Sequence, residues 1–244
     1  MRIFWISVAL LLSYTVQSIS ASDEPKSAAE LRSTLAALET TAAKERTSLT
    51  VIKTSGFTGQ ECKDKQVISV QEANVHYALM RTKVLNAFEN KKESWPLRDW
   101  LAETLPSSGI SEEENLRKCS KGIPVASVGA VDSLWNALRD RVRYITQKPS
   151  LVIDLQIVSY PRKDAPFSLK PLRSEENLFE DRTNAKLNGV YRGIYRISMT
   201  LDGFKPIELQ RINLVDSAND RLDCRFISEG QLGTSSCGLR KGQP

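Results

Sequence analysis

The chain has 244 residues, of which 41% are hydrophobic and 26% charged, and its formal net charge is +5. This basic excess is modest and scattered along the sequence, so it favours weak attraction to anionic surfaces and gives poor support for nucleic-acid binding. The length allows one large domain or two small ones.

The N-terminal segment has the order of an export signal. Arg2 gives a positive start, residues 6–12 are almost continuously apolar, and small residues follow as far as Ala21. An apolar stretch this short does not span a bilayer, which needs about 20 residues. We therefore expect a signal peptide over residues 1–21, with an uncleaved N-terminal anchor as the alternative. The mature chain is expected to be periplasmic or secreted, with no transmembrane segment and no nucleic-acid partner.

Two long helices are expected next. Ser27 begins a capping box, and apolar residues follow it at 4-3-4 spacing, with Glu45 in one apolar slot. A second apolar stripe covers residues 70–88. The spacing predicts helices over about 27–53 and 66–91 that pack as an antiparallel hairpin. A coiled-coil dimer through the same stripes is the alternative.

Three shorter helices complete the predicted helical region. Pro96 lies in the first turn of a helix expected over 95–105. The acidic residues after Ser111 open another short helix, because acids stabilise the positive end of the helix dipole. A strong apolar stripe predicts a last helix over about 127–147. Together these segments predict an all-helical domain over residues 22–148.

After residue 149 the apolar pattern changes to a period of two. Residues 151–157 alternate, and the clearest alternation covers residues 195–201. Residues 173–188 are polar and are expected to form a long loop. Further strands are expected at 167–169, 207–215 and 222–226, before a tail that ends in basic residues. Short strands with frequent turns predict a small antiparallel β-sandwich over residues 149–244, and hence an α+β fold class.

Three short motifs stand out in the C-terminal region: a strand that ends in Ser159-Tyr-Pro161, then Gly193-Ile-Tyr-Arg-Ile, then Gly203-Phe204. In these motifs the region resembles PEGA and carboxypeptidase-regulatory-like β-sandwich modules. The sequence departs from the pattern in the insertion over residues 172–187. The resemblance implies an accessory, structural or ligand-presenting domain without catalytic residues.

The four cysteines indicate disulfides. An even number of cysteines in an exported chain is typical of disulfide pairing, and four allow three connectivities. We favour Cys62–Cys119 and Cys224–Cys237, because each pair then stays within one predicted domain. The spacing lacks a CxxC pattern and a neighbouring histidine, so it does not favour zinc.

The sequence gives little support for catalysis. His76 is the one histidine, it lies beside an apolar helix stripe, and a packing or surface role is the better interpretation. The chain has no GxSxG, Ser-x-x-Lys, P-loop or GxGxxG motif. We expect no cofactor, no metal site and no catalytic residue.

Two groups of carboxylates are nevertheless candidates for reacting groups or ligands. Helix capping explains residues 112–114, and solvation explains the acids of the predicted loop, namely Glu175, Glu176, Glu180 and Asp181. Two of these acids facing each other across a pocket at roughly 5–10 Å would support a glycosidase. A calcium site at Glu180 and Asp181 is the other alternative.

Four residues are candidate ligand contacts. Trp95 and Trp100 flank the start of the short helix, but a spacing of five places them on different helix faces. Trp100 is expected to be buried with the apolar side of that helix. Arg139 and Arg143 share a face of the last helix and are candidates for an anion-binding patch, although they also complement its dipole.

We therefore expect an exported, non-enzymatic scaffold or binding protein of the cell envelope. Its helical domain would contact a protein partner, and an anionic envelope polymer is the second expected partner. The alternatives are a secreted cell-wall polymer hydrolase that uses the loop carboxylates, and a secreted effector or inhibitor.

Overall fold

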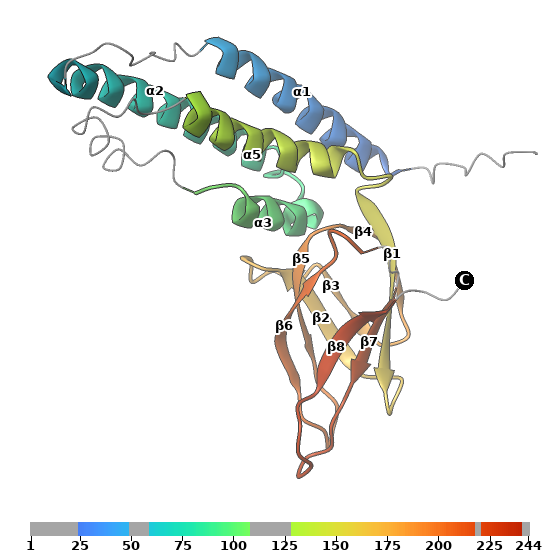
Figure 1. Cartoon of the computed structure of the whole chain (residues 1–244). Coiled ribbons are helices and arrows are strands. Elements are labelled where there is room, and N and C mark those ends of the chain that lie inside the picture. The colour runs from blue at the N-terminus through green and yellow to red at the C-terminus, as the bar shows by residue number, and fades with distance from the viewer. Residues whose placement is uncertain (1–23, 49–58, 108–127, 218–220, 241–244) are drawn as a thin grey trace, which may run out of the picture.

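The computed structural model describes residues 24–48, 59–107, 128–217 and 221–240. The N-terminal half is helical, and its helices lie together at one end of the C-terminal strands (Figure 1). The elements are α1 (Lys26–Ser48), α2 (Gly59–Asn86), the short 3-10 helix η1 (Lys92–Ser94), α3 (Trp95–Thr104) and α5 (Val128–Thr146).

These helices agree closely with the sequence prediction. α2 begins earlier than expected, because its first turns are polar and carry no apolar stripe. The short helix expected after Ser111 lies outside the described residues. None of the described helices has the length and apolar character needed to cross a membrane.

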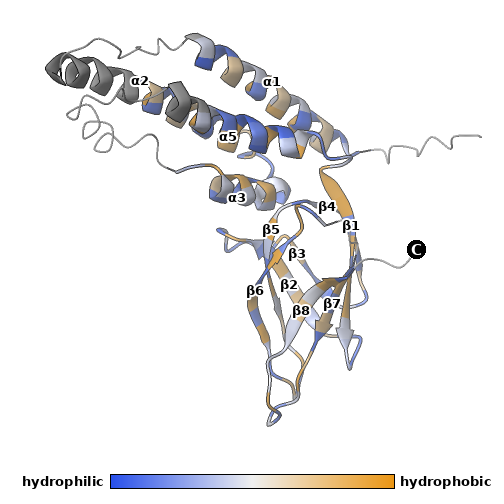
Figure 2. Ribbon diagram, in the orientation of Figure 1, coloured by the Kyte–Doolittle hydropathy of each residue, from blue (hydrophilic) through white to orange (hydrophobic). Residues whose placement is uncertain are grey.

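The predicted apolar stripes pack against one another within the chain. Figure 2 shows hydrophobic and hydrophilic residues alternating along α1. α1 contacts both α2 and α5, and its contact with α5 is the more extensive. The arrangement is therefore a group of three long helices rather than a simple hairpin. The buried residues include Leu31, Leu35 and Ala42 of α1, Ala73, Tyr77, Met80 and Val84 of α2, and Leu134, Trp135, Leu138, Val142 and Ile145 of α5.

The C-terminal half forms two four-stranded sheets. The strands are β1 (Val152–Tyr160), β2 (Pro166–Pro171), β3 (Phe179–Arg182), β4 (Lys186–Tyr191), β5 (Ile194–Met199), β6 (Ile207–Asn213), β7 (Arg221–Arg225) and β8 (Ser236–Arg240). One sheet has the order β4-β1-β7-β8 and the other β3-β2-β5-β6. The fold is therefore α+β, with helices first and strands second.

The expectation of purely antiparallel strands is wrong for one pair. β1 and β7 are parallel, with Ile157 opposite Leu222 and Ser159 opposite Cys224. Parallel neighbours need a crossover connection, and the whole of the second sheet lies between β1 and β7 in the sequence. Alternation along a strand does not reveal its direction, so the pattern could not predict this pairing.

The prediction of a long loop over 173–188 is also wrong. β3 pairs with β2, and β4 pairs with β1, each at the edge of its sheet. In β3, Phe179 is half-buried and the other residues are exposed. Because both faces of this edge strand meet solvent, its sequence shows no apolar alternation. The predicted basic tail likewise contains β8, which pairs with β7.

Two hydrophobic clusters hold the structure. The first fills the helices and extends to Leu151, Tyr191, Ile194 and Val215, which lie at the ends of strands or next to them. The second contains buried residues of both sheets. Because the helical cluster includes residues from the C-terminal half, the helices and the sheets share buried surface.

Arg32 ties the linker before β1 to the helices. Its Nη1 donates to the carbonyl oxygens of Thr146 and Lys148, at 2.5 and 2.7 Å, which satisfies carbonyls at the end of α5. Its Nε and Nη2 donate to the two carboxylate oxygens of Glu24, at 3.0 and 2.9 Å. Glu24 Oε1 also accepts a hydrogen bond from the Leu151 amide at 2.6 Å. One guanidinium–carboxylate pair therefore joins α1, α5 and the start of the sheets.

Replacing Arg32 by alanine is expected to lower the free energy of unfolding by about 2 kcal/mol, because Glu24 and the carbonyl groups lose their donors. Burial raises the pKa of Glu24, but hydrogen bonds from Arg32 and Leu151 outweigh it and hold the pKa below its usual value. The carboxylate therefore stabilises the fold fully above its unfolded pKa, and this contribution is lost as pH falls through the folded pKa.

Urea unfolding of both proteins at neutral and acidic pH tests this expectation, and the stability difference between them should shrink at the acidic pH. Arg139→Ala is the control, since the Arg139 side chain is 40% exposed and pairs with its neighbour Asp140. An equal loss of stability in the two variants would contradict a special role for Arg32.

Candidate functional site

A cleft separates the beginning of α3 from the connection between β2 and β3. It has a volume of about 590 Å³ and contains three residues that the sequence analysis singled out, Trp95, Glu175 and Glu176. The other lining residues are Arg98, Asp99, Pro171, Arg173 and Ser174. The cleft therefore lies where the helical half meets the sheets.

Asp99 positions one wall of the cleft. Its side chain is on α3, the residue is 2% exposed, and Oδ2 accepts a hydrogen bond from the Arg173 amide at 3.0 Å. Burial raises the pKa of Asp99, although the hydrogen bond from the Arg173 amide opposes this shift. A buried carboxylate that accepts backbone hydrogen bonds fixes the β2–β3 connection against α3.

Glu175 is held by two basic residues of the sheet behind it. Lys170 Nζ lies 2.6 Å from Oε2, and Arg196 Nη2 lies 3.2 Å from Oε1. Arg196 Nη2 also donates to the Ser174 carbonyl oxygen at 2.8 Å. The hydrogen bonds from Lys170 and then Arg196 hold the pKa of Glu175 below its usual value. Glu175 therefore stays ionised and acts as an anchor for the connection.

Glu176 is directed to a different partner. Its carboxylate lies 2.8 Å from Lys92 Nζ, which comes from η1 beside α3. Lys92 also lies over the ring of Trp95, with Nζ 5.9 Å from the centroid. The two glutamates thus make separate ion pairs, one within the sheet and one to the helical half. This arrangement does not favour a pair of carboxylates working together on a glycosidic bond.

The two arginines that line the cleft have fewer hydrogen bonds and ion pairs than its glutamates. Arg98 Nη2 lies 3.8 Å from Glu89, while its Nε is buried without a hydrogen-bond partner among the described residues. The Arg173 side chain is exposed. Together with half-buried Trp95, these groups form a surface suited to holding a polar or anionic ligand against an aromatic ring.

The other candidate ligand residues lie elsewhere. Trp100 is 6% exposed and stacks on Tyr144 with ring centroids 5.9 Å apart, so its predicted burial is confirmed. Arg143 pairs with Glu39 of α1 at 2.7 Å, and Arg139 pairs with Asp140. The structure does not bring these residues to Trp95.

The remaining acidic candidates do not converge either. Glu180 accepts a hydrogen bond from Asn177, and Asp181 accepts one from the Arg182 amide, which follows it in β3. Within the described ranges no group of three or more His, Cys, Asp and Glu residues could hold a metal ion. His76 is half-buried on α2. The acids at 112–114 and the pair Cys62–Cys119 lie outside the residues whose side chains are described.

Several residues that build the cleft and hold its walls carry little signal in the sequence. Asp99, Lys92, Lys170 and Arg196 were not singled out. A signal existed only for Asp99, a carboxylate between Leu97 and Trp100 in a largely apolar helix. The roles of Lys92 and Arg196 depend on contacts between segments far apart in the chain, whereas Lys170 lies only five residues from its partner Glu175.

Comparisons with known proteins do not identify the chain. No family model matches the sequence, and no curated protein matches it. A solved structure described as a crystal structure of (S)-allantoin synthase aligns with 88% of this chain and 96% of its own, at 10% identity and a TM-score of 0.27. A likeness at that score supports no inference about fold or activity.

Proposed function

We propose that this protein is an exported, non-enzymatic scaffold or binding protein of the cell envelope, which contacts a protein partner through its helical half. The observation that carries the proposal is an apolar pair on the outer face of α2. Val75 and Leu79 are 57% and 55% exposed, and they lie one turn apart. Large side chains adjacent on an open helix face are typical of contact surfaces.

Several features support the other parts of the proposal. The signal-like sequence of residues 1–21 favours export, and the bond between Cys224 and Cys237 is compatible with an oxidising compartment. The shared cluster of buried residues from both sheets supports a β-sandwich module of the PEGA-like kind. Three contacts between the halves favour a fixed orientation of helices and sheets, as a scaffold requires. They are the close approach of Gly193 to the Pro96 backbone, the hydrogen bond of Asp99 with Arg173, and the Arg32–Glu24 pair that reaches the Leu151 amide.

The double variant Val75→Ser and Leu79→Ser tests the partner surface. We expect it to reduce chemical cross-linking to a partner in the native envelope by about tenfold. The two side chains would be buried in the complex, and removing their apolar contacts costs more than about 1.4 kcal/mol of binding free energy. Its unfolding transition should be unchanged, since both side chains are exposed in the free protein.

Leu232→Ser is the matched control, because Leu232 is 100% exposed and lies in the connection between β7 and β8. This variant should retain full cross-linking. The proposal fails if the wild-type protein is recovered from its envelope only as an isolated monomer, or if the double variant cross-links as well as the wild type.

A further inference from the structure

A second pocket lies on the sheets, far from α3 in the sequence and lined by no residue of the cleft. Its volume is about 640 Å³, within the range of small-molecule sites. We call it the arginine pocket and define it by Tyr160, Phe204, Asp223, Arg225, Phe226 and Arg240, which line it.

Strand β7 supplies the polar side of the arginine pocket. Leu222 and Cys224 are 0% exposed and belong to the cluster shared by the sheets. Because side chains alternate along a strand, Arg221, Asp223 and Arg225 lie on the opposite, outer face. Arg240 of β8 pairs in register with Arg221 across that face. Three arginines and one aspartate therefore share a small area.

Asp223 organises two of the arginines. It is 6% exposed, and each of its oxygens is used: Oδ1 lies 2.6 Å from Arg221 Nε, and Oδ2 lies 3.0 Å from Arg240 Nε. Each contact is made through Nε, so the Nη1 and Nη2 atoms of the guanidinium groups do not pair with Asp223. Arg221 uses Nη2 to donate to the Tyr160 hydroxyl at 2.8 Å. The two guanidinium groups are thus held in place before any ligand arrives.

Arg225 is the unneutralised charge of the pocket. It is exposed, and its side chain has no hydrogen bond or ion pair with any described residue. Arg225 and Arg240, which line the pocket, leave an excess of one positive charge over Asp223. Arg221, which contacts the lining residues Asp223 and Tyr160, raises this excess to two. A phosphate monoester carries about two negative charges at neutral pH and offers three acceptor oxygens, so it matches this excess better than a carboxylate does. Arginine is the side chain best suited to bind such a group.

The other side of the arginine pocket is apolar. Phe204 and Phe226 pack edge to face with ring centroids 6.2 Å apart, and Pro161 and Ile227 complete the wall. A free inorganic ion would leave this wall unused. A ligand with an apolar body next to its charged group would contact both sides.

We propose that the arginine pocket binds a phosphate monoester carried on an apolar or aromatic body, either as a soluble small molecule or as the headgroup of an anionic lipid. This site is separate from the partner surface of α2, and it does not depend on the proposed function. The excess charge of Arg225 and the Phe204–Phe226 wall are the two elements of recognition.

Calorimetric titration of the full chain, with its disulfide oxidised, tests the proposal with phenyl phosphate and inorganic phosphate as probes. Phenyl phosphate should bind at least about tenfold more tightly, because only its ring reaches the apolar wall. Arg225→Gln should weaken phenyl phosphate binding by about tenfold or more through loss of a charge-assisted contact. Its thermal unfolding should match that of the wild type, because Arg225 is exposed.

Arg182→Gln is the matched control, since it removes one exposed arginine from β3, in the other sheet. It should change binding by less than about twofold. Flotation with phosphatidic acid vesicles separates the two ligand sources: Arg225-dependent vesicle binding indicates a lipid headgroup, and binding of phenyl phosphate alone indicates a soluble ligand. The proposal is overturned if neither probe binds, or if Arg182→Gln weakens binding as much as Arg225→Gln.

Discussion

Gly193→Ala is expected to lower the free energy of unfolding by about 4 kcal/mol, from overpacking and backbone strain together. Gly193 has φ of +150°, and a Cβ added there would lie 2.2 Å from the carbonyl carbon of Pro96 and 2.4 Å from the amide nitrogen of Leu97. Both atoms belong to the backbone of α3, so no side-chain rotation relieves the clash. Either α3 must move away from β5 or the β4–β5 turn must deform.

Substitutions at two other glycines separate the effect of overpacking from that of backbone strain. Gly238 has open space around an added Cβ, and Gly203 has equally open space but φ of +80°. Gly238→Ala should change stability little, and Gly203→Ala should cost about 1 kcal/mol for its left-handed backbone. Urea unfolding of the three variants measures the series. If Gly193→Ala lowers the free energy of unfolding no more than Gly203→Ala does, the backbone of α3 does not pack closely against the β4–β5 turn.

The same close approach explains why the cleft exists. α3 contacts β2 and β5, and the missing side chain at Gly193 lets the helix start reach the turn that leads into β5. Asp99 then meets the Arg173 amide. The stability measured at Gly193 and the shape of the cleft therefore depend on the same contact between the two halves.

The helices could be predicted because their apolar stripes are long. The stripe of α5, for example, recurs over five buried residues from Leu134 to Ile145. The edge strand β3 could not be predicted, because its exposed faces remove the alternation that identifies a strand. In β4 the buried residues Leu187, Val190 and Tyr191 are not spaced by two, so this strand shows no regular alternation either. The parallel pairing of β1 with β7 depends on the path of the chain through the second sheet, which no local pattern records.

The site was predictable in its parts but not in its assembly. The sequence alone indicated three of its residues as candidates, and the structure brings them to one cleft: Trp95, Glu175 and Glu176. Their meeting depends on Asp99 and Gly193, whose roles require the packing of α3 on the sheets. The arginine pocket could not be predicted for a similar reason: Arg240 comes to lie opposite Arg221 only when β7 pairs with β8 in this register.

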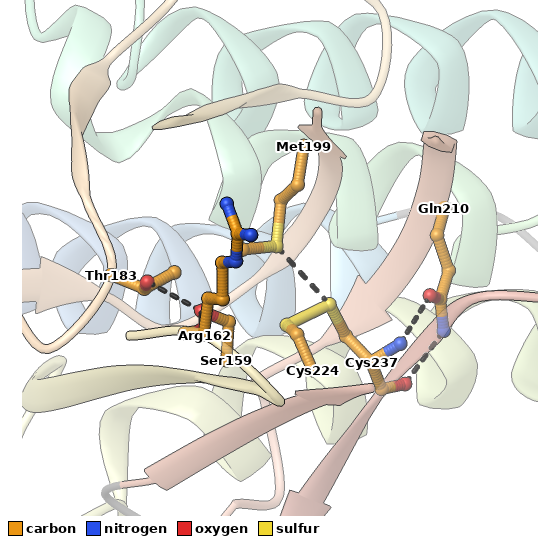
Figure 3. The surroundings of a disulfide bond; sticks show 7 residues. All are labelled: Ser159, Arg162, Thr183, Met199, Gln210, Cys224 and Cys237. Carbon is orange, nitrogen blue, oxygen red and sulfur yellow. Dashed lines mark hydrogen bonds between the residues drawn. A yellow bond between two sulfur atoms is a disulfide. The ribbon is translucent and has the colours of Figure 1, made fainter. Parts of the chain in front are cut away.

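The predicted pair Cys224–Cys237 is confirmed, and removing it should have the second large effect on stability. The two residues lie opposite each other in β7 and β8, at 0% and 7% exposure, and Met199 Sδ lies 3.6 Å from Cys237 Sγ (Figure 3). Gln210 of β6 bonds both backbone groups of Cys237, at 2.7 Å each. The disulfide thus joins two strands of one sheet, and Gln210 joins that sheet to the other.

Cys224→Ala with Cys237→Ala should lower the free energy of unfolding by about 3 kcal/mol for the cross-link, plus a further loss for the buried sulfur atoms. The double valine variant is the matched control, because valine suits a strand and fills much of the lost volume. The valine variant should regain the stability lost with the buried sulfur atoms, but it should remain about 3 kcal/mol less stable than the wild type because the cross-link is absent. Urea unfolding under oxidising conditions measures both. A valine variant as stable as the wild type would show that the bond does not stabilise the sheets, and that the hydrogen bonds of Gln210 and the strand pairing suffice to hold β8.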